Sequence, residues 1–375
     1  MTSQATMLQS TMSSFDDMTF SSAASYFNFS DLNTTMVATR QPYVRPFGTA
    51  GIITSAVILF TCLVIGVIGN VLTIVVILTN QKLRNLFMYF IVSLCVSDLT
   101  SALISWLFLY RRTWGFDVWD PIPGIFCKFY WAADVMTNYV TASHIFSFAL
   151  IRYISIQFPI RFSKIKLIHG KIWIALIWFV CFCVGFIPWF IFFGARIRDR
   201  YSDSPDARWP ACTINMEWYD QYTLATKVCY SIFLYAPSVG VVFLSILIGI
   251  TVKSRPSMSS QEDGKRKQKE KQAVLQLVLI VVSFLIGYVP FTAYEFWSTQ
   301  PRPNTMYYKS FDYWFGMSEY FCIRISECLN PIFYNLGSAK MRKCTAGLLR
   351  KMFGCKRQRK VAHVSSSHGT QNFGV

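Results

Sequence analysis

Two charged residues lie inside the last long apolar segment of this 375-residue chain. Arg324 and Glu327 are three residues apart within residues 311–335, so on a helix they would lie on one face and could form an ion pair. A charge at the centre of a bilayer costs at least about 2.5–3.5 kcal/mol on insertion scales, so such residues are expected to face a partner, a cavity or a pathway. The pair therefore predicts working parts inside a membrane.

A carboxylate in the third apolar segment, Asp134, could bind a ligand. In an aromatic-lined cavity it would attract a cation by charge pairing and by the cation–π interaction. Glu295, five residues after Pro290, either contacts a second amine or is a solvated residue at the rim. The candidate walls of the cavity are Tyr139, Phe291, Tyr294, Tyr320 and Phe321.

The arginine leaves two arrangements of these charges open. If Arg324 pairs with Asp134, the carboxylate that would bind a cation is neutralised. If Arg324 pairs with Glu327, Asp134 stays free. Breaking a buried pair costs about 3–5 kcal/mol, so the two arrangements predict different ligands. A free Asp134 favours a small amine, whereas a paired Asp134 favours a peptide or a neutral small molecule.

The elements that must position these residues are long apolar helices. The chain is 53% hydrophobic and only 15% charged, whereas a soluble domain carries about a quarter charged residues. Backbone polar groups find no water inside a bilayer, so runs long enough to span about 30 Å of hydrocarbon are expected to be helical. Such runs lie near residues 50–79, 87–110, 124–157, 171–194, 219–253, 268–298 and 311–335. The expected fold is all-α, a seven-transmembrane helix bundle.

The charge pattern predicts the orientation of the bundle. The net charge is +17, and the basic residues concentrate in alternate loops and in the C-terminal tail. By the positive-inside rule these loops are cytoplasmic and the N-terminus is extracellular. Because the charge sits in short loops between apolar runs, no nucleic-acid partner is expected, and the bilayer is the expected surroundings.

The segments outside the spans predict four regions. Residues 1–45 are expected to form an extracellular tail with N-glycosylation sites at Asn28 and Asn33. The transmembrane domain would cover 46–336 and a disordered cytoplasmic tail 356–375. Residues 337–355 would form an amphipathic eighth helix on the membrane, and Cys355 is either palmitoylated or an unmodified thiol.

Two cysteines are expected on the oxidising side of the membrane. Cys127 opens the third run at its outer end, and Cys212 lies in the loop between the fourth and fifth runs. Disulfides form and persist in such a compartment, so the two are predicted to be bonded to each other.

Short motifs occur in all seven segments, in chain order. With them the chain resembles the rhodopsin-like (class A) G-protein-coupled receptors along residues 45–355. The stretch from Asp134 to Tyr153 looks closest to the aminergic branch, in particular the histamine and muscarinic receptors. The motifs are Gly69-Asn70-Val71, Leu94-Cys95-Val96-Ser97-Asp98-Leu99, Ala149-Leu150-Ile151-Arg152-Tyr153, Trp178, Pro237, Phe284-Leu285-Ile286-Gly287-Tyr288-Val289-Pro290-Phe291 and Asn330-Pro331-Ile332-Phe333-Tyr334.

The resemblance implies a plasma-membrane receptor and not an enzyme. A biogenic amine is the first ligand expected, a heterotrimeric G protein is the intracellular partner, and arrestin is a further one. No cofactor is implied apart from a structural sodium ion held by Asp98, Thr141 and Asn330. The residues implied in switching and in meeting the G protein are Arg152, Tyr153, Glu270, Tyr288, Asn330, Pro331 and Tyr334.

Three departures from the family pattern predict altered basal activity without fixing its direction. Ile151 replaces the acid that normally precedes Arg152, and Glu270 could pair with that arginine instead. Tyr288 replaces a tryptophan, and Ser245 replaces a tyrosine of the fifth helix. A transporter is the more distant alternative, because neither repeated halves nor discontinuous helices are evident.

Overall fold

The computed structural model describes residues 45–116, 119, 122–197, 210–254, 261–298, 300–301, 303 and 305–354, all within the compact unit Tyr43–Val375. Within these ranges the side chains of residues 196–197, 210, 261–267, 269–270 and 273 are not described. The predicted sites at Asn28, Asn33 and Cys355 lie outside the described residues, as do most of the two predicted tails.

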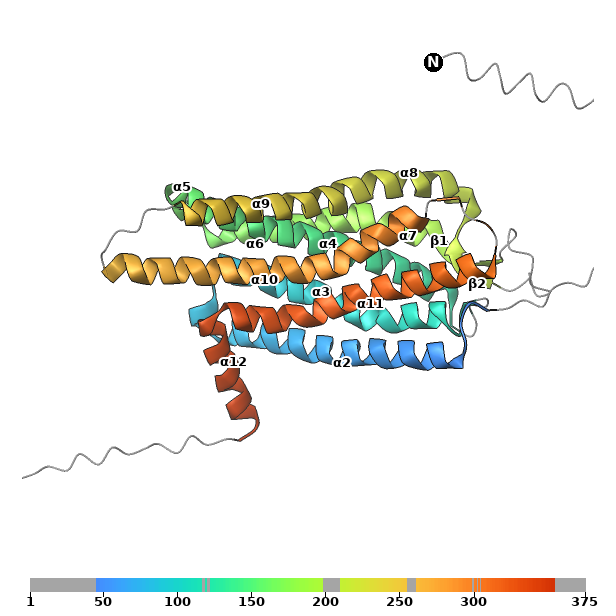
Figure 1. Cartoon of the computed structure of the whole chain (residues 1–375), viewed down its shortest axis with the longest axis horizontal. Coiled ribbons are helices and arrows are strands. Elements are labelled where there is room, and N and C mark those ends of the chain that lie inside the picture. The colour runs from blue at the N-terminus through green and yellow to red at the C-terminus, as the bar shows by residue number, and fades with distance from the viewer. Residues whose placement is uncertain are drawn as a thin grey trace, which may run out of the picture. The chain divides into compact units, whose positions relative to one another are not determined.

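Long helices form the whole of the bundle (Figure 1). Each predicted apolar run corresponds to one continuous helical segment. Five of these segments are single helices, namely α2 (Thr49–Thr79), α3 (Leu86–Arg112), α4 (Gly124–Gln157), α10 (Gln261–Ser298) and α11 (Met306–Gly337). The fourth segment consists of α6 (Leu167–Cys181), η2 (Phe182–Phe186) and α7 (Ile187–Phe192). The fifth consists of η3 (Met216–Trp218), α8 (Tyr219–Tyr230), η4 (Ser231–Tyr235) and α9 (Ala236–Lys253). Shorter helices are η1 (Gln81–Leu83), α5 (Pro159–Ser163) and α12 (Ala339–Met352).

Within the described residues, six of the seven long helical segments are long and apolar enough to cross a membrane. The exception is α11, and in α10 the apolar part is Val274–Ser298. The α11 helix has 32 residues, enough for a span, but it carries the predicted charged pair. Glu319 lies on the same helix and is also buried. Neighbouring helices therefore bury Glu319, Arg324 and Glu327, as charges inside a membrane require.

Two proline residues follow turns of π-helix. The turn η2 precedes Pro188 at the start of α7, and the turn η4 precedes Pro237 at the start of α9. Proline cannot donate the hydrogen bond of a regular helix, and a π-turn adjusts the helix around the missing bond. Pro290 and Pro331 instead lie inside the continuous helices α10 and α11.

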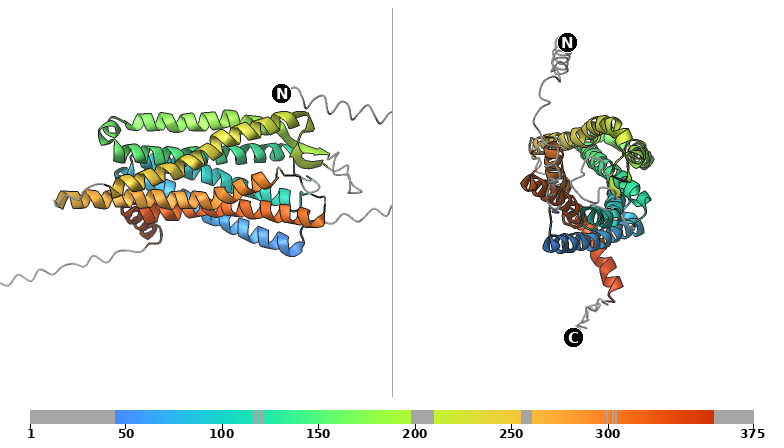
Figure 2. Two further views of the ribbon diagram at one scale, coloured as in Figure 1. Left: turned by 45° about the horizontal axis from the view of Figure 1, so that its top comes forward. Right: turned by 90° about the vertical axis from the view of Figure 1, so that its right-hand side faces the viewer.

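The helix α4 lies at the centre of the bundle. It packs against α3, α6, α7, α9 and α10, and the two views in Figure 2 show the other helices around it. His144 of α4 is buried, and its Nε2 atom is 2.8 Å from Ser93 Oγ of α3. Trp178 Nε1 donates to the same hydroxyl at 2.8 Å. This histidine is therefore buried and hydrogen-bonded between α3 and α4.

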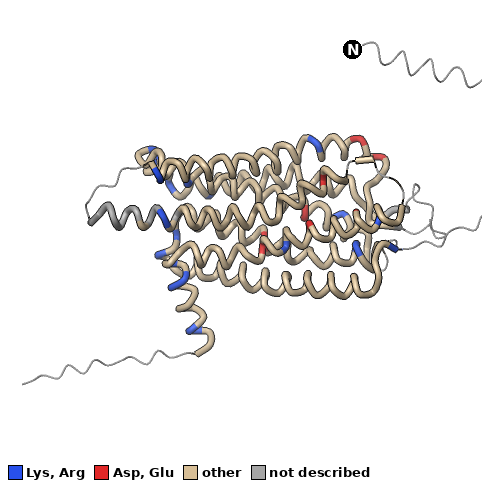
Figure 3. The backbone as a smooth tube through the Cα atoms, in the orientation of Figure 1, with Lys and Arg blue, Asp and Glu red and all other residues tan. Residues whose placement is uncertain are grey.

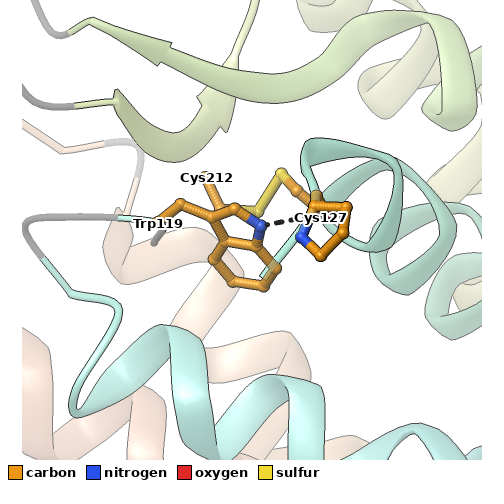
Figure 4. The surroundings of a disulfide bond; sticks show 4 residues. Trp119, Cys127 and Cys212 are labelled. Carbon is orange, nitrogen blue, oxygen red and sulfur yellow. Dashed lines mark hydrogen bonds between the residues drawn. A yellow bond between two sulfur atoms is a disulfide. The ribbon is translucent and has the colours of Figure 1, made fainter. Parts of the chain in front are cut away.

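A short hairpin covers one end of α4. Strands β1 (Phe193–Ile197) and β2 (Pro210–Ile214) are antiparallel, with Ala195 opposite Cys212. The predicted disulfide joins Cys212 to Cys127 in the first turn of α4. Figure 4 shows the Trp119 indole beside this bond, and its Nε1 atom donates to the carbonyl oxygen of Pro123 at 3.4 Å.

Basic residues gather at the end of the bundle from which α12 leaves (Figure 3). The helix α12 begins at a cap in which the Ser338 hydroxyl accepts from Met341 N at 3.3 Å. A helix is thus present within the predicted range 337–355. Its position on a membrane surface stays a prediction, as does the extracellular placement of the N-terminus.

Candidate functional site

Arg324 is the centre of a buried charge cluster. It lies in α11 with only 2% of its side chain exposed. Its Nη1 atom is 3.0 Å from Glu327 Oε2, one turn away on the same helix. Its Nη2 atom is 3.5 Å from Asp134 Oδ1 of α4. The guanidinium therefore contacts both carboxylates, and the contact with Glu327 is the shorter one.

Two further groups complete the surroundings of the guanidinium. The hydroxyl of Ser101 in α3 accepts a hydrogen bond from Arg324 Nη1. The ring centroid of Tyr320 lies 4.5 Å from the guanidinium carbon, and Tyr320 itself stacks on Phe108. Tyr320 was among the predicted site residues, whereas Ser101 was not. A signal was available, because Ser101 is three residues after Asp98 and so lies on the same face of α3.

The cluster holds two acidic groups around one cation. The side chain of Asp134 is 12% exposed, so both charges of the Arg324–Asp134 pair are largely removed from water. Leaving one partner of such a pair without the other is strongly destabilising. The structure combines the two arrangements that the sequence left open, because Arg324 pairs with Glu327 and also contacts Asp134.

Three of the five aromatic residues predicted as walls fall into two separate groups. Tyr320 lies at the charge cluster, as described above. Tyr139 and Phe291 instead pack on Tyr230 of α8, each with ring centroids 6.0 Å from it. Trp189 stacks on Tyr230 from α7 at 6.2 Å. The structure therefore places Tyr139 and Phe291 in an aromatic cluster between α4, α7, α8 and α10.

The predicted site residues of α10 near its C-terminal end have different surroundings. The hydroxyl of Tyr294 accepts from Arg112 Nη2 at 3.3 Å, and Arg112 is the last residue of α3. Glu295 is half-buried, and no ion pair involves it among the described side chains. Arg112 lies beyond the predicted apolar run 87–110, and neither Arg112 nor the buried Glu319 was among the predicted site residues.

A second polar cluster lies between α3, α4 and α11. Asn330 Nδ2 donates to Asp98 Oδ2 at 2.9 Å, and both residues are buried. The hydroxyls of Ser97 and Thr141 are 3.1 Å apart. Asp98 Oδ1 and Asn330 Oδ1 are buried without a hydrogen-bond partner within the described chain. Two of the three predicted members of a cation site, Asp98 and Asn330, are therefore in direct contact, and the third, Thr141, is bonded to the neighbouring Ser97.

The residues expected to act as a switch lie at several levels of the bundle. Tyr288 is buried, and its hydroxyl donates to Asn138 Oδ1 of α4 at 3.1 Å. Tyr334 is fully buried in α11, three residues after Pro331. The ring of Tyr153 lies edge-on to Phe158 at 6.3 Å. Among the described side chains, no hydrogen bond or ring contact joins Tyr288 of α10 to Asn330, Pro331 or Tyr334 of α11.

Arg152 has aromatic surroundings and no ionic partner in the part of the chain that the structure describes. Its guanidinium carbon lies 3.8 Å from the ring centroid of Phe87 and 5.4 Å from that of Phe148. Glu270, its expected partner, lies in α10 among the residues whose side chains are not described. The pairing of Arg152 with Glu270 therefore stays a prediction.

The amino-acid sequence of this chain is similar to that of a known family of membrane proteins. A family model described as "7 transmembrane receptor (rhodopsin family)" matches residues 69–334. Growth hormone secretagogue receptor type 1 of Sus scrofa is 27% identical over 306 residues, 80% of this chain and 81% of that receptor. Neuromedin U receptor homolog nmur-2 of Caenorhabditis elegans is 24% identical over 325 residues, 78% and 79% of the two chains. Substance-K receptor of Mus musculus is 24% identical over 277 residues, 72% and 68% of the two chains.

Proposed function

The chain belongs to the rhodopsin family of seven-transmembrane receptors, and from this premise we propose that its extracellular ligand is a peptide. Membership of this family makes the protein a class A G-protein-coupled receptor and not an enzyme, with a G protein as its intracellular partner. The expected multi-pass membrane fold is confirmed by the same match. The transporter alternative is not retained.

The observation that carries the proposal is the engagement of Asp134 by Arg324, at 3.5 Å. An ammonium ligand that used Asp134 as its anchor would have to displace a buried guanidinium, and separating a buried pair costs about 3–5 kcal/mol. That cost is comparable to a large part of the binding free energy of a micromolar ligand, about 8 kcal/mol. The site is therefore poorly suited to a small amine.

The relatives support the same ligand class. Their names describe receptors for neuromedin U, for substance K and for growth hormone secretagogues, and these are peptide receptors. At 24–28% identity they support a peptide as the class of ligand and say nothing of its sequence. The expectation of an aminergic receptor, which rested on the position of Asp134, receives no support from them.

One observation still favours an amine as the second candidate. Arg324 lies closer to Glu327, at 3.0 Å, than to Asp134, and the side chain of Asp134 retains some exposure. A rotation of the guanidinium toward Glu327 would release Asp134. The amine is thus the alternative that the test of the peptide proposal must include.

A ligand screen tests the proposal directly. Cells that express the full chain, with sensors for each class of Gα subunit, are exposed to a library of synthetic neuropeptides and to a panel of biogenic amines. We expect a peptide to activate the receptor at nanomolar to micromolar concentration, and the response to survive Asp134→Asn. Activation by an amine that Asp134→Asn abolishes, without any peptide response, would overturn the proposal.

We also propose that the polar cluster at Asp98 holds a sodium ion. The two oxygens without partners in the described chain, the carboxylate Oδ1 of Asp98 and the amide Oδ1 of Asn330, fit a hard cation that prefers oxygen ligands. The Thr141 hydroxyl, which is bonded to Ser97, is the third ligand that we propose. The ion would supply a counter-charge for the buried carboxylate. Glycosylation of the N-terminal tail, palmitoylation of Cys355 and binding of arrestin remain proposals of the same kind.

A further inference from the structure

Arg152 sits in an aromatic cradle at the junction of three helices. The cradle consists of Phe87 in α3, Phe148 in α4 and Phe162 in α5. The rings of Phe87 and Phe148 meet edge-to-face at 5.6 Å, and those of Phe87 and Phe162 stack at 5.8 Å with 24° between their planes. Phe87 is therefore in contact with both of the other rings.

The guanidinium of Arg152 is held by the ring of Phe87. Its central carbon is 3.8 Å from the ring centroid, well inside the range of about 6 Å at which a cation is attracted by the negative face of an aromatic ring. Phe148 adds a second, more distant contact at 5.4 Å. Within the described chain Arg152 forms no ion pair, and its Nε atom has no hydrogen-bond partner. The cation–π contact is thus the main attraction on its charge.

The start of α3 fixes the position of Phe87. Asn85 caps this helix, and its side-chain oxygen accepts from Met88 N at 3.2 Å. Phe87 is the second residue of α3 and lies between this cap and the buried Met88. A capped first turn holds its side chains in defined directions, so the ring is kept in place beside α4.

The adjacent sequence explains why such a cradle is useful. Position 151, next to Arg152, is isoleucine, so no carboxylate is available from the neighbouring residue. We propose that Phe87 is a positioning residue that holds Arg152 in the resting receptor, in place of an acidic partner. Through Phe162 the same ring is linked to α5. The proposal depends on G-protein coupling and not on the class of ligand.

Ligand-independent signalling tests this role. In cells with Gα sensors, Phe87→Leu is expected to raise basal activity about fivefold at equal surface expression, the factor corresponding to a partly desolvated cation–π contact. Phe87→Trp, which offers a stronger ring face, is expected to keep basal activity at or below that of the wild type. Phe146→Leu, a half-buried phenylalanine of α4 outside the cradle, serves as the matched control and should leave basal activity unchanged.

Two further measurements separate charge from packing. Replacing Phe87 with mono-, di- and trifluorinated phenylalanine keeps the shape of the ring but weakens its negative face, so basal activity should rise step by step. Ile151→Asp in the Phe87→Leu background supplies a carboxylate and should lower basal activity toward the wild-type level. Unchanged basal activity in Phe87→Leu, a flat fluorination series, or no effect of the added aspartate would overturn the proposal.

Discussion

Replacing Arg324 with methionine is expected to destabilise the receptor by about 3–5 kcal/mol, the cost of leaving a buried charge without its partner. The variant keeps a long apolar side chain but leaves Asp134 and Glu327 facing each other without a cation. Because the guanidinium bonds to Ser101 of α3 and pairs with Asp134 of α4, the variant also loses the polar contacts that Arg324 makes from α11 to these two helices. Thermal unfolding of the detergent-solubilised receptor and its level at the cell surface measure the loss.

A triple variant separates charge from packing at this site. In Arg324→Met with Asp134→Asn and Glu327→Gln the cluster is neutral and its volume is nearly kept. Replacing a buried ion pair by neutral groups of similar volume is often close to neutral in stability, so most of the stability should return. If the single variant unfolds at the wild-type temperature, or if the triple variant is no more stable than the single one, the account of this cluster is wrong.

Removal of the disulfide between Cys127 and Cys212 is expected to cost about 2–5 kcal/mol and to abolish the response to ligand. The bond joins residues 85 positions apart and ties β2 to the first turn of α4. Without it the hairpin β1–β2 is no longer fixed over that end of the bundle. The double variant Cys127→Ser with Cys212→Ser, assayed for thermal unfolding and for activation, measures both effects.

The control for this experiment is a cysteine that forms no disulfide in the structure. Cys183 lies in η2 and is half-buried, and Cys183→Ser should behave as the wild type does. An equal effect of the two changes would show that loss of thiols in general, and not of this bond, is responsible. A double variant with wild-type stability and wild-type activation would contradict the role given to the disulfide.

The fold followed from the sequence because apolar length is a strong signal in a membrane. Every predicted run became one helical segment, and the run at 311–335 was included in spite of its charges. The ends were less exact, since α3 continues to Arg112 and α11 begins at Met306, beyond the apolar residues. A helix continues wherever its hydrogen bonds and packing are satisfied, which composition does not show.

The site was predicted in part. Spacing along one helix gave the contact between Arg324 and Glu327, and residue type gave Asp134 as the acid on α4. Spacing could not decide between the two partners, because the answer depends on how α4 and α11 face each other. For the same reason spacing could not show that the ring of Tyr139 packs on Tyr230, and its role as a wall of a ligand cavity stays a prediction. The cradle brings Phe87 together with Phe148 and Arg152, which lie more than 60 positions further along the chain, and no local pattern indicates it.

The central claim is that Arg324 closes Asp134 to amines in a receptor for a peptide. The most direct test exposes two receptors, the wild type and the double variant Arg324→Tyr with Glu327→Gln, to a panel of biogenic amines and compares their responses. In the double variant Asp134 is the remaining acid of the cluster. We predict that the wild type is silent and that amine responses appear in the variant, where they require Asp134. An amine response of the wild type that is lost in Asp134→Asn would contradict the claim.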